Sequence, residues 1–101
     1  MAYDIIWMPM ARISYIQTLE YIREHWSYAE LEAFQSATED AITRISKFPE
    51  IYEYSPQSNT RRCVLSKQVS LYYQVNKSRQ IVELLVFWDN RQDPQKLIVR
   101  E

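Results

Sequence analysis

The sequence predicts a single α+β domain over residues 1–101, in which a short strand precedes two helices and three further strands. In the first half, apolar residues recur at helical spacing, and the second half holds segments rich in β-branched and aromatic residues. Short turns join the last three strands, so these should pair antiparallel. The expected architecture is β-α-α-β-β-β, with a helical hairpin packed on one face of a small, mainly antiparallel sheet.

The first expected elements are a strand at Tyr3–Trp7 and a helix that begins at Pro9. Proline is favoured in the first helical turn, where its missing N–H leaves no hydrogen bond unmade. Large apolar residues then recur every three or four positions, and we expect them to face the sheet. This predicted stripe comprises Ile13, Ile16, Leu19, Ile22 and Trp26.

The second helix is predicted from its ends. Ser27 and Glu30 form an S-x-x-E capping box, which places the helix start at about Tyr28, and Pro49 ends it. The short break between the helices implies an antiparallel hairpin. Its predicted buried stripe comprises Leu31, Phe34, Thr38, Ala41, Ile42, Ile45 and Phe48.

A loop is expected over residues 49–60, and strands over 61–67, 69–75 and 80–88. The last strand is apolar on both faces, which is typical of a central strand. With the helices on one face, the other face has no predicted cover. We therefore expect Leu85 and Phe87 to form an exposed apolar patch there.

Composition excludes several kinds of site and location. The chain has no glycine, which excludes phosphate-cradling and dinucleotide-binding loops. With a single cysteine, the chain cannot form an internal disulfide. One cysteine and one histidine make a poor set of metal ligands, so neither a metal nor a cofactor is expected. No apolar run approaches the roughly 20 residues of a membrane span, and residues 1–10 lack the features of a signal peptide. We expect a cytoplasmic protein without a membrane partner.

Charge is unevenly distributed along the chain. Residues 1–60 hold four basic and nine acidic side chains, a balance of −5, whereas residues 61–101 hold eight basic and four acidic, a balance of +4. A basic half is typical of a surface for an acidic partner, although ordinary charge scatter gives the same figures.

Four segments together resemble the RelE/ParE toxin superfamily of bacterial type II toxin–antitoxin systems. They are IIWMP, then HWSYAELEAFQSATEDAITRISKFPE, then RRCVLSKQVSLYYQV, and finally IVELLVFWDNRQDP. The resemblance spans nearly the whole chain and implies that superfamily's fold. It also implies a cognate antitoxin as a partner, with no sequence-specific DNA binding by this chain itself.

The resemblance leaves three functions open. RelE-like members cleave mRNA at the ribosome with basic residues on the sheet, and ParE-like members inhibit DNA gyrase by binding. A fold relic that binds a partner without toxicity is the third. By position, Arg61 and Arg91 match the RelE-like basic set, whereas Cys63, Ser70 and Leu97 stand where that branch has basic or aromatic residues. The sequence therefore predicts a ParE-like toxin without catalytic residues.

Partner binding is expected on the sheet and in the basic second half. His25 and Cys63 are interpreted as structural, because no acid or nucleophile pattern accompanies either of them. Arginines suit antitoxin carboxylates, and aromatic or apolar side chains suit its anchors. The predicted binding residues are Arg61, Arg62, Tyr72, Arg79, Leu85, Phe87, Trp88 and Arg91.

Overall fold

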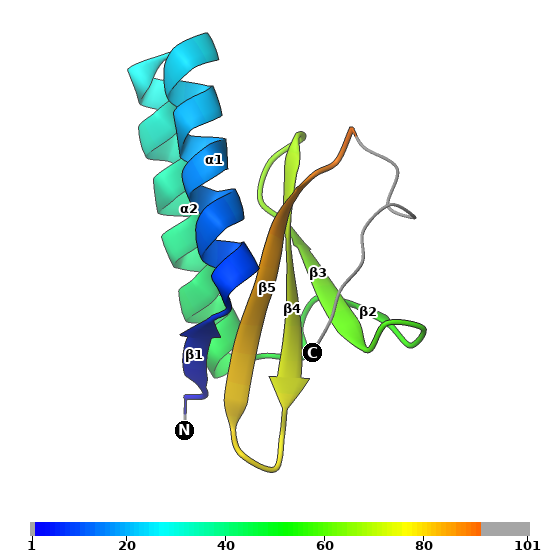
Figure 1. The fold of residues 1–101 in the computed structure, drawn as a ribbon. Coiled ribbons are helices and arrows are strands. Elements are labelled where there is room, and N and C mark those ends of the chain that lie inside the picture. The colour runs from blue at the N-terminus through cyan, green and yellow to red at the C-terminus, as the bar shows by residue number, and fades with distance from the viewer. Residues whose placement is uncertain (1, 92–101) are drawn as a thin grey trace.

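The structure is a computed structural model that describes residues 2–91. Two helices follow the first strand, and four strands complete the described part of the chain (Figure 1). The expected order is confirmed, with one additional short strand. The elements are β1 (Asp4–Trp7), α1 (Pro9–His25), α2 (Tyr28–Lys47), β2 (Glu53–Ser55), β3 (Thr60–Val64), β4 (Val69–Asn76) and β5 (Ile81–Asp89).

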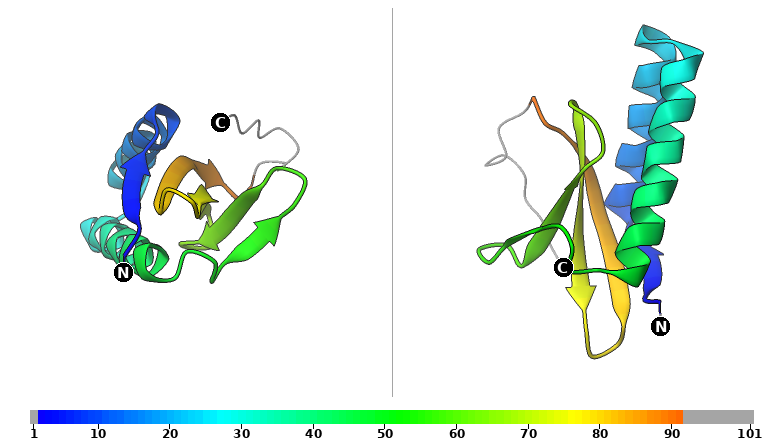
Figure 2. Two further views of the ribbon diagram at one scale, coloured as in Figure 1. Left: turned by 90° about the horizontal axis from the view of Figure 1, so that it is seen from below. Right: turned by 180° about the vertical axis from the view of Figure 1, so that it is seen from behind.

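The strands form one sheet in the order β1-β5-β4-β3-β2. Only the pairing of β1 with β5 is parallel, and the other three pairings are antiparallel. Both helices lie on one face of the sheet, which curves away from them toward β3 and β2 (Figure 2). This confirms the helical hairpin on one face of a mainly antiparallel sheet. The three-residue β2 was missed because it lies in a segment of turn formers that ends at Pro56.

The helix boundaries agree with the local signals. Pro9 occupies the first turn of α1, and α2 begins after Ser27, whose side chain accepts a hydrogen bond from the Glu30 N–H. The Glu30 carboxylate in turn accepts from the Ser27 N–H, which completes the capping box. The helix ends at Lys47, and Phe48 has left the helical conformation, with φ −134° and ψ 71°.

The buried stripe of α2 is as predicted at its centre. In α1, Ile22 is buried and Leu19 and Trp26 pack against the core as predicted, but Ile13 and Ile16 do not. Ile13 and Ile16 are 50% and 56% exposed, whereas Ala11 and Ser14 are buried against the sheet. Small side chains let α1 approach β5 closely, so size as well as apolar spacing selected the buried face. Phe48 is also exposed, because it lies after the end of α2 and no longer follows the helical periodicity that places side chains on the buried face. The buried α2 residues are Phe34, Thr38, Ala41 and Ile45.

A β-bulge in β5 corrects the expected apolar patch. Tyr72 pairs with Val86 and Tyr73 with Leu84, so Leu85 is an extra residue without a partner on β4. The extra residue shifts the alternation by one, which brings Phe87 to the same face as Leu84, under the helices. The expectation that Leu85 and Phe87 are exposed is therefore wrong, and they are 6% and 4% exposed.

Phe87 belongs to an aromatic cluster between the sheet and the helices. Its ring centroid lies 5.6 Å from that of Trp7 and 5.0 Å from that of Tyr15. Tyr15 also stacks on Phe34 of α2 at 6.0 Å. The cluster joins β1, both helices and β5, so it packs the helices against the sheet.

Candidate partner-binding surface

A hollow of about 350 Å³ lies between α1 and the second half of β5, and we call it the α1–β5 groove. Its floor and walls are mainly apolar or aromatic, with a charged pair at one end, as is typical of binding sites. The helix contributes Met10, Ser14, Gln17, Thr18, Tyr21 and Trp26. The strand side contributes Val86, Phe87, Trp88 and Asp89, with Arg91 beyond the strand end.

The groove exists because β1 is shorter than β5. Pairing with β1 ends at Leu84, whose carbonyl accepts a hydrogen bond from the Met8 N–H at 3.0 Å. Farther along β5, the Phe87 N–H donates to the Ser14 hydroxyl at 2.9 Å. That hydroxyl donates to the Met10 carbonyl at 2.6 Å. A side chain thus takes the place of a neighbouring strand at the edge of β5.

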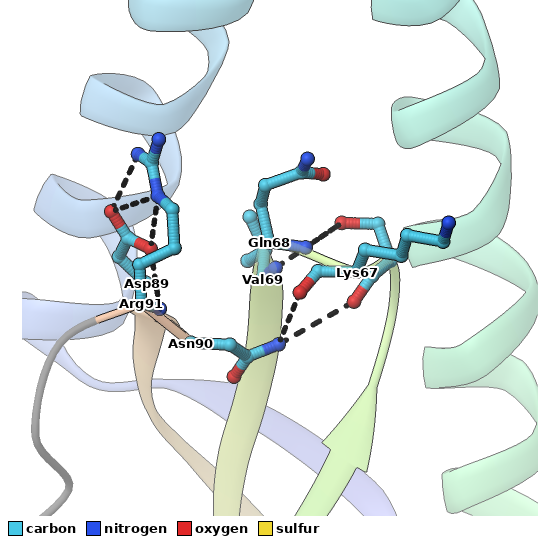
Figure 3. A network of polar contacts seen from close by, with 7 residues as sticks. Lys67, Gln68, Val69, Asp89, Asn90 and Arg91 are labelled. Atoms are coloured by element: carbon cyan, nitrogen blue, oxygen red, sulfur yellow. Dashed lines mark hydrogen bonds and ion pairs between the residues drawn. The ribbon is translucent and has the colours of Figure 1, made fainter.

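An ion pair stands at the outer end of the groove (Figure 3). The Arg91 guanidinium contacts both carboxylate oxygens of Asp89, with its shortest hydrogen bond at 2.8 Å, and holds the pKa of that carboxyl below its usual range. The same guanidinium lies 5.7 Å from the ring of Tyr21, which stacks on His25. These contacts connect the end of β5 to the last turns of α1.

Asn90 fixes the chain that follows β5 against the β3–β4 turn. Its side-chain amide donates to the carbonyls of Ser66 and Lys67, at 3.4 and 3.3 Å (Figure 3). Its backbone N–H donates to the Gln68 carbonyl at 2.7 Å. The ion pair at the groove end is therefore built on an anchored backbone.

The face of the sheet away from the helices carries three of the predicted binding residues. Arg62 is paired with Tyr72 in the sheet register, and Ser70 with Trp88. The Arg62 Nε donates to the Ser70 hydroxyl at 3.2 Å, and that hydroxyl donates to Asn90 Oδ1 at 2.7 Å. The Trp88 indole N–H is buried and has no acceptor among residues 2–91.

Arg61 serves the fold rather than an open surface. Its guanidinium donates to the carbonyls of Glu50 and Tyr52, at 3.1 and 2.9 Å, and lies over the Tyr54 ring at 4.9 Å. It also pairs with the Glu50 carboxylate at 3.6 Å. These bonds hold the segment after α2 against β3.

The predicted arginines do not form one cluster. Arg61 pairs with Tyr73 on β4, and Asp89, the partner of Arg91, pairs with Val69. Val69 and Tyr73 are four residues apart on β4, so the positions of Arg61 and Asp89 are separated by about 13 Å along the strand direction. Arg79 lies in the turn between β4 and β5, at the opposite end of β5 from Arg91.

Comparison with known proteins identifies the fold. No protein-family model and no curated protein matches the sequence. A solved structure does match, a chain of the toxin–antitoxin complex RelBE2 from Mycobacterium tuberculosis, with a TM-score of 0.61. The match covers 89% of this chain and 100% of that chain, at 15% sequence identity. The protein has the fold of that chain. The likeness concerns the fold alone and does not distinguish a ParE-like from a RelE-like protein.

Two positions that the resemblance led us to compare with basic residues of the RelE-like branch hold small buried residues. Cys63 and Ser70 are 1% and 0% exposed. Burial raises the pKa of the Cys63 thiol, which keeps it in the unreactive neutral form. Leu97, which stands where that branch is expected to have an aromatic residue, lies outside the described residues.

No three His, Cys, Asp or Glu side chains come together as a possible metal site within residues 2–91. Within the part of the chain that the structure describes, neither helix is long and apolar enough to cross a membrane.

Sequence reasoning missed Ser14 and Tyr21 as parts of the groove. A serine within an amphipathic helix gives no local signal of contact with a strand more than 70 residues away. The position where β1 ends, which opens the groove, also depends on pairing and not on composition.

Proposed function

We propose that this chain is the toxin of a type II toxin–antitoxin system, neutralised by a cognate antitoxin. One observation carries the proposal: a chain of a toxin–antitoxin complex is matched over its full length by this fold. The α1–β5 groove and the outer sheet face offer an apolar hollow and arginines to such a partner. Arg62, Tyr72, Trp88 and Arg91 remain candidate contacts, with Arg79 at the far end of β5. Leu85 is buried and does not line the groove, whereas Phe87, although only 4% exposed, does line it and stays a candidate.

We further propose the ParE-like mode, inhibition of DNA gyrase by binding without catalysis. RelE-like cleavage of mRNA relies on several basic groups converging on one phosphate, which stabilise negative charge and protonate the leaving oxygen. Among the described residues, the Arg61 guanidinium donates hydrogen bonds to backbone carbonyls. Arg91 pairs with Asp89 near the other end of the sheet, so the two arginines cannot reach one phosphate together. Cys63 and Ser70 supply no positive charge.

The RelE-like alternative rests on Arg62. Its side chain is 40% exposed on the sheet face away from the helices, next to Tyr72, and basic and aromatic groups side by side suit contact with RNA. The relic alternative needs only the groove and the fold.

Inducible expression in a bacterial host separates the three functions. Growth arrest that is relieved by co-expressing the protein encoded beside the toxin gene supports the toxin proposal. Normal growth at high levels of folded protein would favour the relic. Purified toxin should then block supercoiling by gyrase, and primer extension should find no codon-phased cuts in translated mRNA. Such cuts, with gyrase unaffected, would establish the RelE-like mode instead.

A further inference from the structure

We infer that the tip of the α1–α2 hairpin contacts the toxin's target, and that it fits a basic, DNA-binding surface of that enzyme. The inference rests on the proposed function, because it names the surface through which the toxin inhibits gyrase. The hairpin tip is defined as residues 20–32, which comprise the last turns of α1, the connection and the first turns of α2. Its position, its charge and one exposed aromatic side chain lead to this inference.

The hairpin tip stands clear of the sheet. Both helices extend beyond the ends of β4 and β5, so the tip projects from the rest of the molecule (Figures 1 and 2). The connection between the helices is short and fixed. The Trp26 N–H donates to the Ile22 carbonyl at 2.8 Å, and the capping box of Ser27 and Glu30 follows directly. A projecting surface that is already ordered loses little conformational entropy when it binds a partner.

The hairpin tip is acidic. Residues 20–32 hold four acidic side chains and one basic side chain, a balance of −3. No ion pair within residues 2–91 neutralises any of the four carboxylates. They are all exposed, and they belong to Glu20, Glu24, Glu30 and Glu32.

This charge selects the kind of partner. An acidic surface attracts a basic surface and repels the phosphates of a nucleic acid. Proteins that bind DNA present basic surfaces to its backbone, so an enzyme that acts on DNA offers the complementary charge. The rRNA of a ribosome does not. The hairpin tip therefore suits a surface of gyrase that otherwise holds DNA.

Tyr28 supplies an aromatic anchor for the contact. Its side chain is 73% exposed, and no hydrogen bond or ring contact engages it within residues 2–91. Glu32 follows it by four residues, so the two side chains lie on the same face of α2. Tyrosine is enriched among the residues that carry most of the binding energy at protein interfaces. The tip thus combines an apolar anchor with a neighbouring carboxylate.

Two double variants test the charge of the tip. Glu24→Lys/Glu32→Lys reverses two tip carboxylates, and Glu39→Lys/Asp40→Lys makes the same change in net charge at exposed positions farther along α2. The purified full-length variants are titrated into a gyrase supercoiling assay. We expect the tip variant to raise the toxin concentration that halves supercoiling about tenfold or more, and the control to raise it less than about threefold. Circular dichroism checks that both variants are folded.

Two single variants test the anchor. Tyr28→Ala removes the ring at the start of α2, and Phe48→Ala removes a ring that is 62% exposed just after its other end. We expect Tyr28→Ala to weaken inhibition of gyrase about tenfold, and Phe48→Ala to leave it unchanged. The neutralising protein encoded beside the toxin gene should bind both variants as tightly as it binds the wild type.

Competition with DNA tests the surface on the partner. Because the hairpin tip and DNA share one basic surface, excess linear DNA should displace wild-type toxin from gyrase in a direct binding assay. Binding that excess DNA leaves undiminished, or equal inhibition by the tip and control variants, would overturn the tip contact while leaving gyrase as the target. If Tyr28→Ala lost neutralisation and kept inhibition, the tip would belong to the antitoxin interface instead. A wild-type chain that leaves gyrase active would overturn the ParE-like mode and this inference together.

Discussion

The Tyr73 hydroxyl donates a hydrogen bond of 2.7 Å to the backbone carbonyl of Pro49, and both groups are buried. This bond ties the exit of α2 to the middle of β4, across 24 residues of sequence. Burial also raises the pKa of Tyr73, so the hydroxyl stays protonated and able to donate. The bond positions the segment that Arg61 also fixes.

Tyr73→Phe should lower the free energy of unfolding by about 1–3 kcal/mol, because it leaves the Pro49 carbonyl buried without a donor. Urea denaturation measures the loss. Tyr54→Phe is the matched control: its hydroxyl bonds Asn59 on an exposed part of the chain, and its removal should change stability by less than about 0.5 kcal/mol. Equal effects of the two changes would mean that the buried bond contributes nothing special.

Phe87→Ala should destabilise the fold by about 3–5 kcal/mol, because it empties the space between Trp7 and Tyr15. Ile16→Ala, on the exposed side of α1, should cost less than about 0.5 kcal/mol beyond any change in helix propensity. Denaturation midpoints of both variants test the corrected assignment of faces. A tolerated Phe87→Ala would restore the expectation of a surface patch.

Ser27→Ala should cost about 1 kcal/mol, since it removes the acceptor for the Glu30 N–H at the start of α2. Ser27→Asp should retain most of the stability, because aspartate also accepts at this position and favours the helix N-terminus. Thermal unfolding followed by circular dichroism compares the two. Equal losses in both variants would rule out the cap as the cause.

Stability should fall as pH rises from about 8 to 10, around the ordinary thiol pKa of about 8.5. Burial raises the pKa of the Cys63 thiol in the folded state, so the thiol of the unfolded chain loses its proton at a lower pH. Rising pH therefore stabilises the unfolded state relative to the folded state. The contribution is thus complete below the unfolded pKa and is lost as pH approaches the folded one. Cys63→Ala should flatten this part of the pH profile, whatever its effect at neutral pH. An unchanged slope would assign the alkaline loss to other groups.

The local sequence determined the elements and their order. Pro9, the Ser27–Glu30 capping box and Pro49 act within one or two turns of the backbone they control, so the helix boundaries were readable without tertiary information. Alternation along Val69–Val75 likewise placed Tyr73 in the core, where it is 0% exposed.

Only the tertiary structure decided which residues form the candidate site. The bulge at Leu85 exists because β4 and β5 pair out of step by one residue, and a one-residue shift moves every later side chain to the other face. In α1, Ala11 and Ser14 face the sheet, whereas Ile13 and Ile16 are exposed. Close packing on β5 depends on side-chain volume as well as on hydrophobicity. The groove itself follows from the point where β1 ends and Ser14 meets Phe87, 73 residues apart in sequence. Contacts over such separations are set by packing, which local patterns do not encode.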